Sequence, residues 1–214
     1  MLEVNEIFGP TIQGEGLRIG ERAWFIRLSR CDLRCPWCDT KYAWLPGEMM
    51  PEEDIADRLD PRECDGVVIT GGNPALQDAT DLVKLLRFRG HVGISVETQG
   101  TVYADWLRLV DTIAVSPKRG HVNEDVIHRI CNLPREVFLK PVVFDDEDFE
   151  FAMDLAGEFP DITTVFQVGS DGDAGADLER LRWLMERVSS LHTTLDIRVL
   201  PQLHVIAWGQ RRGV

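Results

Sequence analysis

The chain has 214 residues, of which 44% are hydrophobic and 28% charged, the composition of a globular protein with a sizeable core. Its 23 basic and 36 acidic residues give a net charge of −13, which argues against a nucleic acid partner because such binding rests on neutralising phosphates. No apolar run reaches the roughly 20 residues of a membrane span, and no signal peptide is visible at the N-terminus. We therefore expect a cytoplasmic protein with no membrane partner.

Short β-type runs alternate with helical patterns along the whole chain. After an N-terminal piece, we expect strands over 22–29, 65–70, 91–98, 111–116, 137–143, 163–168 and 195–200. Helices are expected over 51–60, which opens with proline and acidic residues, and over 78–90, 146–159 and 177–188. No repeat or low-complexity linker interrupts this pattern, so residues 1–214 are predicted to form one compact domain.

The alternation predicts an α/β fold with parallel strands and right-handed crossovers. An open sheet and a partial (β/α) barrel both fit this order. Polar residues or glycines lie at the ends of five of the predicted strands or just past them: the cysteine loop after 22–29, 71–73, 97–98, 116–118 and 167. Barrel enzymes build their sites from many strand ends, whereas a doubly wound sheet gathers its ligand contacts at one switch point. The pattern therefore favours the partial barrel.

Three of the five cysteines, Cys31, Cys35 and Cys38, lie within "CDLRCPWCDT". An odd count without an export signal argues against a disulfide framework, and we expect Cys64 and Cys131 to be small buried hydrophobic residues. A structural zinc site needs four ligands, and none of the histidines lies at finger-like spacing from this loop. A [4Fe–4S] cluster held by three cysteines would leave one iron open. The spacing favours the cluster and leaves zinc as the alternative.

The CxxxCxWC pattern resembles the signature of the radical S-adenosylmethionine (SAM) enzymes, in which the open iron binds the amino and carboxylate groups of SAM. "TGGNP" (70–74), at the end of a predicted strand, resembles the GGE-type motif of that superfamily, which contacts the SAM amino group. Asn73 stands where glutamate is usual, and its amide can accept a hydrogen bond without the assistance of a charge. The resemblance implies a partial barrel of the radical SAM type.

The segment "EIFGPTIQGEGLRIGERAWFIRLSRCDLRCPWCDT" resembles the 7-carboxy-7-deazaguanine synthases almost from end to end. The likeness continues through "VVITGGNPALQ", "VETQGT", "SPK" and "QLH". It implies a lyase that uses a [4Fe–4S] cluster, SAM and Mg²⁺ to contract the ring of 6-carboxy-5,6,7,8-tetrahydropterin to 7-carboxy-7-deazaguanine, with loss of ammonia, on the way to 7-deazapurines such as queuosine.

The resemblance also implies roles for individual residues. The cluster would be held by Cys31, Cys35 and Cys38, and Mg²⁺ by the hydroxyl of Thr40. SAM would be contacted by Trp37, Cys38, Asp39, Gly71, Gly72, Asn73, Gly100, Ser116, Pro117, Lys118 and Gln167. The substrate would be contacted by Ile12, Gln13, Gly14, Glu15, Arg27, Thr98, His204 and the C-terminal Val214.

The chemistry of several of these residues suits such a substrate. Arg27 can bind a carboxylate through two parallel hydrogen bonds. The alternative is that Arg27 is an ordinary surface charge. The "GEG" turn would let the backbone approach a flat ring closely, or it is an ordinary turn. His204 fits either a packed interior position or the site, and His91, His121, His128 and His192 are expected to be structural or exposed.

Two rival functions remain open at this stage. Another radical SAM enzyme, such as a glycyl-radical activase acting on a protein, would share the cysteines and the glycine pair but has no use for "IQGEG" or Arg27. A zinc-stabilised binding module would share only the thiols. The family resemblance further implies a flavodoxin or ferredoxin as reductant and a homodimer.

Overall fold

The computed structural model describes all 214 residues, and its ten strands belong to one sheet. The sheet order is β10-β9-β7-β6-β5-β4-β2-β1-β3, with β8 paired to β9. The strands are β1 (Leu2–Ile12), β2 (Arg22–Leu28), β3 (Glu48–Met50), β4 (Gly66–Gly71), β5 (Ile94–Thr98), β6 (Thr112–Val115), β7 (Glu136–Leu139), β8 (Val142–Val143), β9 (Thr164–Val168) and β10 (Ile197–Leu200).

Six α-helices and four short 3-10 helices connect the strands. The α-helices are α1 (Glu52–Asp57), α2 (Thr80–Phe88), α3 (Glu124–Cys131), α4 (Asp146–Glu158), α5 (Ala174–Ser189) and α6 (Leu203–Trp208). The 3-10 helices are η1 (Gly16–Arg18), η2 (Lys41–Trp44), η3 (Pro74–Leu76) and η4 (Asp105–Leu109). None of the α-helices combines the length and the apolar character needed to span a bilayer.

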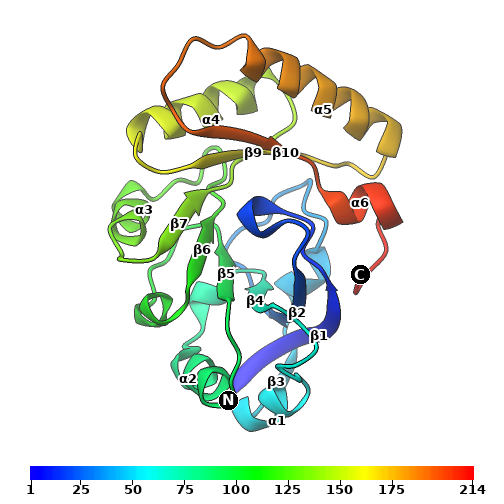
Figure 1. Cartoon of the computed structure of the whole chain (residues 1–214), viewed down its shortest axis with the longest axis vertical. Helices are drawn as coiled ribbons and strands as arrows, with labels where there is room; N and C mark the ends of the chain where they lie inside the picture. Colours follow the sequence, from blue (N-terminus) through cyan, green and yellow to red (C-terminus); the bar gives the residue numbers. More distant parts are fainter.

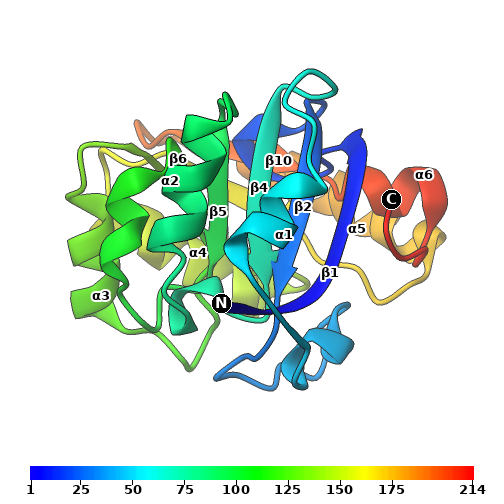
Figure 2. The same cartoon turned by 90° about the horizontal axis from the view of Figure 1, so that it is seen from below.

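Apart from β3, which lies beyond β1, and β8, which pairs only with β9, the strands from β2 to β10 follow one another across the sheet in chain order and pair in parallel. Because the order never reverses, the sheet has no topological switch point, which excludes the doubly wound alternative. Figure 1 shows the strands along an arc, with α2, α3, α4 and α5 on its outer side. Viewed from below in Figure 2, α1 and α2 lie in front of the strands, and α3 lies to their left. The predicted partial (β/α) barrel is therefore confirmed.

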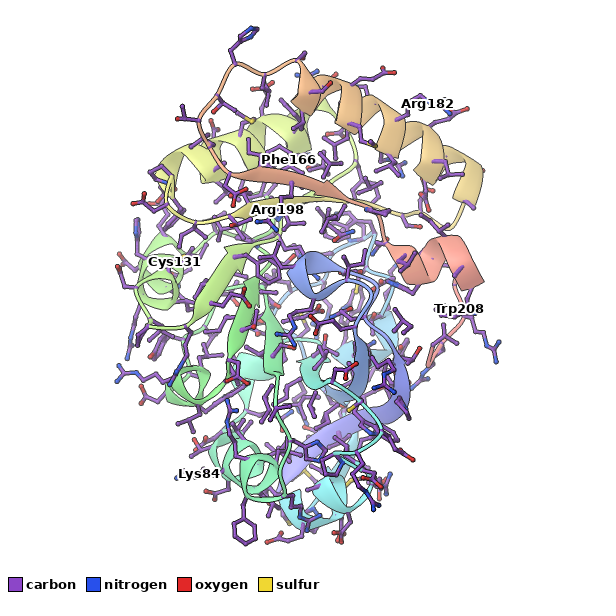
Figure 3. The ribbon with its side chains drawn as sticks, viewed as in Figure 1. Lys84, Cys131, Phe166, Arg182, Arg198 and Trp208 are labelled. Atoms are coloured by element: carbon purple, nitrogen blue, oxygen red, sulfur yellow. The ribbon has the colours of Figure 1, made fainter.

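Side-chain alternation along the strands separates an apolar outer face from a more polar inner face. The largest core cluster joins outward residues of β2, β4, β5 and β6 to α1, α2 and α3, and a second cluster joins β9 and β10 to α4 and α5. Phe166 belongs to the second cluster and lies between β9 and these helices, whereas Arg198 of β10 lies on the other side of the sheet (Figure 3). The inner face is thus free to carry polar groups.

The strand predicted over 137–143 is in fact two strands, β7 and β8. The backbone N–H of Lys140 still donates to Val115 O of β6, but Pro141 has no N–H to continue that ladder. Beyond the proline, β8 pairs with β9, with Val142 opposite Gln167. The break leaves the Lys140 side chain buried on the inner side.

Two strands and two α-helices were not predicted. The N-terminal piece is the strand β1, which pairs antiparallel with both β2 and β3 and covers the edge of the parallel sheet. Helix α3 buries Ile127 and Ile130, and it is capped by Asn123, whose side chain accepts a hydrogen bond from Val126 N. Strand β3 and helix α6 are short, so neither produces a clear periodic pattern.

Candidate active site

One cavity of about 230 Å³ opens on the inner side of the sheet, where the parallel strands end. The loop after β2, the turn after β4, the ends of β5 and β6 and the C-terminal tail all contribute to its lining. Most of the predicted site residues meet here: Ile12, Gln13, Gly14, Glu15, Arg27, Cys31, Cys35, Trp37, Cys38, Asp39, Thr40, Gly71, Gly72, Thr98, Ser116, Lys118, His204 and Val214.

Four predicted residues lie outside the lining of this cavity. Gln167 is fully buried, donates from Nε2 to Leu200 O at 3.0 Å and accepts from Gly16 N at 3.4 Å. Gly100 has φ of +74°, and a Cβ atom there would lie 2.7 Å from Val115 Cγ1. The others are Asn73 and Pro117.

The three cysteines of the loop after β2 are unpaired, half-buried and exposed to the same cavity. Burial raises the pKa of the Cys35 and Cys38 thiols, so the thiolates there need a positive partner. Their sulfur atoms do not gather within 4.8 Å of one another, a distance met only by Glu15, Asp39 and His204. A single tetrahedral zinc ion with bonds of about 2.3 Å would draw thiols closer than that. The donor set fits a larger thiolate-bound cluster.

Gly71 and Gly72 pack closely against the backbone where this loop begins. A Cβ atom would lie 2.1 Å from Leu28 O at Gly71 and 2.1 Å from Arg30 O at Gly72. Only glycine permits this approach, which lets Gly72 N donate to Leu28 O and Asn73 N to Arg30 O. The glycine pair therefore fixes the start of the cysteine loop against the end of β4.

Asp32 is a second anchor of the loop that the sequence did not reveal. Its carboxylate accepts from Asn73 Nδ2 at 2.9 Å, from Gln99 Nε2 at 2.7 Å and from Thr101 Oγ1 at 2.5 Å. The Asn73 carbonyl oxygen in turn accepts from Thr98 Oγ1 at 2.8 Å. Asn73 is fully buried, and its amide is occupied by protein partners.

A network of two carboxylates and one ammonium forms part of the cavity wall. Lys140 Nζ lies 2.5 Å from Glu15 Oε2 and 3.2 Å from Glu97 Oε1. Burial opposes ionisation of Glu15, yet the charges of Lys140 and His204 lower its pKa to about 2. The same two glutamates overcome the effect of burial and raise the pKa of Lys140. The sequence did not predict a role for Lys140, because the strand was expected to run on to residue 143 and Lys140 therefore did not lie at a strand end.

Neutral side chains complete this network. Gln13 Nε2 donates to Glu97 at 3.2 Å, Thr70 Oγ1 donates to Glu97 at 3.2 Å, and Gln202 Nε2 donates to Glu15 at 2.7 Å. Four side chains, Lys140, Gln13, Thr70 and Gln202, therefore fix the orientation of the two carboxylates. Because both carboxylates line the cavity and each oxygen can accept more than one hydrogen bond, a ligand with several N–H groups would suit this wall.

The "GEG" turn serves packing as well as the cavity. A Cβ atom at Gly14 would lie 2.4 Å from His204 Nδ1, and Leu203 N donates to Gly14 O at 2.9 Å. Gly14 therefore lets α6 approach the end of β1 and brings His204 beside Glu15 and Asp39, with ligand atoms within 4.8 Å of one another. Thr40 Oγ1 donates to Asp39 Oδ1 at 2.7 Å beside this group.

Arg27 faces the cavity from β2 and is held on one side only. Its Nε donates to Glu6 Oε1 at 2.7 Å, and its two Nη atoms have no protein acceptor. Glu6 also accepts from Tyr42 OH at 2.8 Å and from Arg212 Nε at 2.7 Å. Burial would raise the pKa of Glu6, but these hydrogen bonds lower it. Glu6 therefore fixes the orientation of Arg27, and both Nη groups remain available to donate hydrogen bonds to a ligand.

Lys118 lies on the cysteine side of the cavity. Its Nζ donates to Ser116 Oγ at 2.6 Å and lies 5.4 Å from the ring centroid of Trp37, which packs on Phe144. Burial and the charge of Lys140 lower the pKa of Lys118 to about 8. An anionic ligand group would therefore find a desolvated cation near Cys35.

The remaining cysteines and histidines lie outside the cavity. Cys64 and Cys131 are half-buried rather than fully buried, and neither lines the cavity. His91 is buried, whereas His121, His128 and His192 are exposed.

Residues 25–182 match the model of the radical SAM superfamily. The 7-carboxy-7-deazaguanine synthase of Bacillus cereus is 36% identical over an alignment that covers 100% of this chain and 99% of that protein. The enzyme of that name from Thermoplasma acidophilum is 32% identical over 99% of both chains. The crystal structure of QueE from Escherichia coli superimposes with a TM-score of 0.72 and 26% identity, over 95% of this chain and 94% of that one.

Proposed function

The chain belongs to the radical SAM superfamily and, within it, to the 7-carboxy-7-deazaguanine synthases, which are radical SAM lyases, and we propose that it contracts the ring of 6-carboxy-5,6,7,8-tetrahydropterin. The product is 7-carboxy-7-deazaguanine, and the reaction is redox-neutral because loss of ammonia accounts for the whole change in composition. The observation that carries the proposal is that one cavity is lined both by three unpaired thiols and by the Gln13–Glu15 segment with Arg27.

The thiols and the residues near them support the use of a cluster and SAM. Cys31, Cys35 and Cys38 would hold a [4Fe–4S] cluster, which supplies the electron that cleaves SAM to a hydrogen-abstracting radical. The glycine pair and Asp32 fix the loop, so the thiols keep their position. Lys118 supplies a cation on this side of the cavity, where SAM would bring a carboxylate.

The opposite side of the cavity supports recognition of a pterin that bears a carboxylate. The free Nη pair of Arg27 matches the two oxygens of a carboxylate. Glu15 and Glu97 offer acceptors to the N–H groups of the pterin ring. Two fixed recognition points at different places hold a flat substrate in one orientation and thereby limit side reactions of a radical.

We propose Mg²⁺ as a further cofactor, held by the hydroxyl of Thr40. Magnesium prefers oxygen ligands and keeps several of its waters. Asp39, Glu15 and His204 lie together beside Thr40 and could receive hydrogen bonds from those waters. The cytoplasmic location, the homodimer, the flavodoxin or ferredoxin reductant and the use of the product in a 7-deazapurine pathway are proposals of the same kind, carried by family membership.

One assay tests the proposed reaction. Protein reconstituted anaerobically with iron and sulfide is mixed with SAM, a reductant, Mg²⁺ and the carboxytetrahydropterin, and the deazaguanine is followed by its absorbance and mass. We expect a brown protein with roughly four irons per chain and product that depends on SAM. An intact cluster without product would contradict the proposed reaction and favour another radical SAM activity. A colourless protein with stoichiometric zinc would contradict the cluster as well.

A further inference from the structure

A single carboxylate on β1 joins the cavity to the C-terminal tail. Glu6 accepts hydrogen bonds from Arg27 on β2, from Tyr42 on η2 and from Arg212 in the tail, at 2.7, 2.8 and 2.7 Å. The side chains of Glu6 and Arg27 are only 13% and 15% exposed, so solvent screens this contact weakly. Neither Glu6 nor Arg212 stands out in the sequence.

Arg212 fastens the tail through further contacts. Its Nη2 donates to Asn5 Oδ1 at 3.1 Å, and its guanidinium carbon lies 3.8 Å from the ring centroid of Tyr42. Gly209, with φ of +63°, ends α6, and two residues beyond Arg212 the chain ends at Val214, which lines the cavity. Figures 1 and 2 both show the C-terminus beside β1. Arg212 therefore ties the tail to β1 and η2 beside the cavity.

The charges of Glu6, Arg27 and Arg212 do not cancel. Two guanidinium groups share the one carboxylate of Glu6, so the three side chains carry a net charge of +1. Glu6 occupies only Nε of Arg27, which leaves both Nη atoms for an acceptor in the cavity. A lone Arg27–Glu6 pair would be neutral and would attract an anion less strongly. Arg212 thus makes Arg27 a better partner for an incoming carboxylate without lining the cavity itself.

We propose that Glu6 and Arg212 are positioning residues with two roles. They fasten the C-terminal tail over the cavity, and they give the group of Glu6, Arg27 and Arg212 a net positive charge while both Nη groups of Arg27 stay free for the substrate carboxylate. This inference rests on the proposed function for the identity of the substrate. The latch itself, made by Arg212, Glu6, Asn5 and Tyr42, is independent of it.

The test compares Arg212→Met with Arg211→Met in the reconstituted enzyme. Arg211 is an exposed neighbour that forms no ion pair, so the two variants remove the same charge from the same segment. We expect Arg212→Met to raise KM for the carboxytetrahydropterin about tenfold and to leave KM for SAM unchanged, whereas Arg211→Met changes neither by more than about twofold. Arg212→Lys should recover part of the loss because it restores the charge but not the paired donors.

Two further measurements separate the roles. The inhibition constant of a tetrahydropterin that lacks the carboxylate should change little in Arg212→Met; an increase equal to that of KM would overturn the assignment to the carboxylate. Release of Val214 by a carboxypeptidase should be several-fold faster in Arg212→Met and Glu6→Gln than in Arg211→Met. Equal rates of Val214 release in the three variants would show that Arg212 and Glu6 do not hold the tail. If the unmodified enzyme makes no product, the proposed function fails, and the release rates still decide the latch.

Discussion

The ammonium group of Lys140 lies 2.5 Å from the carboxylate of Glu15, although 125 positions of the chain separate the two residues. Strand β7 ends at Leu139, and η1 begins at Gly16, so this ion pair ties the middle of the parallel sheet to the segment after β1. Both side chains line the cavity. The pair therefore contributes to the fold and to the binding surface together.

Replacing Lys140 with Met should destabilise the protein by about 3–5 kcal/mol, since it leaves the carboxylates of Glu15 and Glu97 buried without their partner. Urea unfolding at pH 7 measures the loss. Lys84→Met, on the exposed side of α2 (Figure 3), is the control and should change stability by less than about 0.5 kcal/mol. The double variant Lys140→Met with Glu15→Gln should be less destabilised than the sum of the two single variants. Simple additivity would show that the pair is not coupled.

The Glu15 pair should also make stability depend on pH in one direction. The pKa of Glu15 lies near 2 in the folded protein, below its ordinary value of 4.5. The stabilisation is therefore complete above about pH 4.5 and is lost as the pH falls through about 2. The free energy of unfolding of the unmodified protein relative to Glu15→Gln should be constant from pH 7 to 5 and shrink below that. A difference that grows on acidification would refute the assignment.

Gly72→Ala should disrupt the cysteine loop more than the rest of the fold. The added methyl group would lie 2.1 Å from Arg30 O, a backbone atom that cannot move without shifting Cys31. We expect fewer irons per chain after reconstitution, together with a loss of stability of about 2 kcal/mol or more. Gly157→Ala in α4 is the matched control, because no atom lies within 4 Å of its added Cβ and alanine favours helix. Unchanged iron content in Gly72→Ala would show that the close approach is dispensable.

Arg27→Ala should weaken substrate binding far more than SAM binding. Loss of a two-pronged contact to a carboxylate corresponds to roughly 10- to 100-fold in KM for the carboxytetrahydropterin. Arg22 begins the same strand, is exposed and pairs with Asp65, so Arg22→Ala controls for loss of an arginine from β2. Steady-state kinetics with each substrate varied in turn gives the comparison. Similar increases in both KM values would remove Arg27 from the substrate side.

Thr40→Val should raise the Mg²⁺ concentration needed for half-maximal activity, because the variant keeps the shape of the side chain and loses its oxygen ligand. Activity is measured against Mg²⁺ at saturating substrate and SAM. Thr194→Val, at an exposed position before β10, should leave the curve unchanged. If Thr40→Val follows the same curve as the control, the metal has other ligands.

By itself, the sequence determined the features that depend on local patterns. The alternation of apolar runs predicted four of the six α-helices and seven strands, which cover eight of the ten observed because 137–143 was taken as one strand instead of two. The spacing of Cys31, Cys35 and Cys38, with the glycine pair, predicted a thiolate site at strand ends, because a short motif carries its own ligands. Of the predicted site residues, only Asn73, Gly100, Pro117 and Gln167 lie outside the cavity lining.

Only the tertiary structure decided which distant residues complete the site. Lys140 has no local signal, and its contacts with Glu15 and Glu97 exist because the parallel strands end at the same edge. Glu6 and Arg212 meet because the tail folds back to β1, 206 positions away in the chain. Pairing across such separations depends on the closing of the whole sheet, and no short pattern of residue types records it.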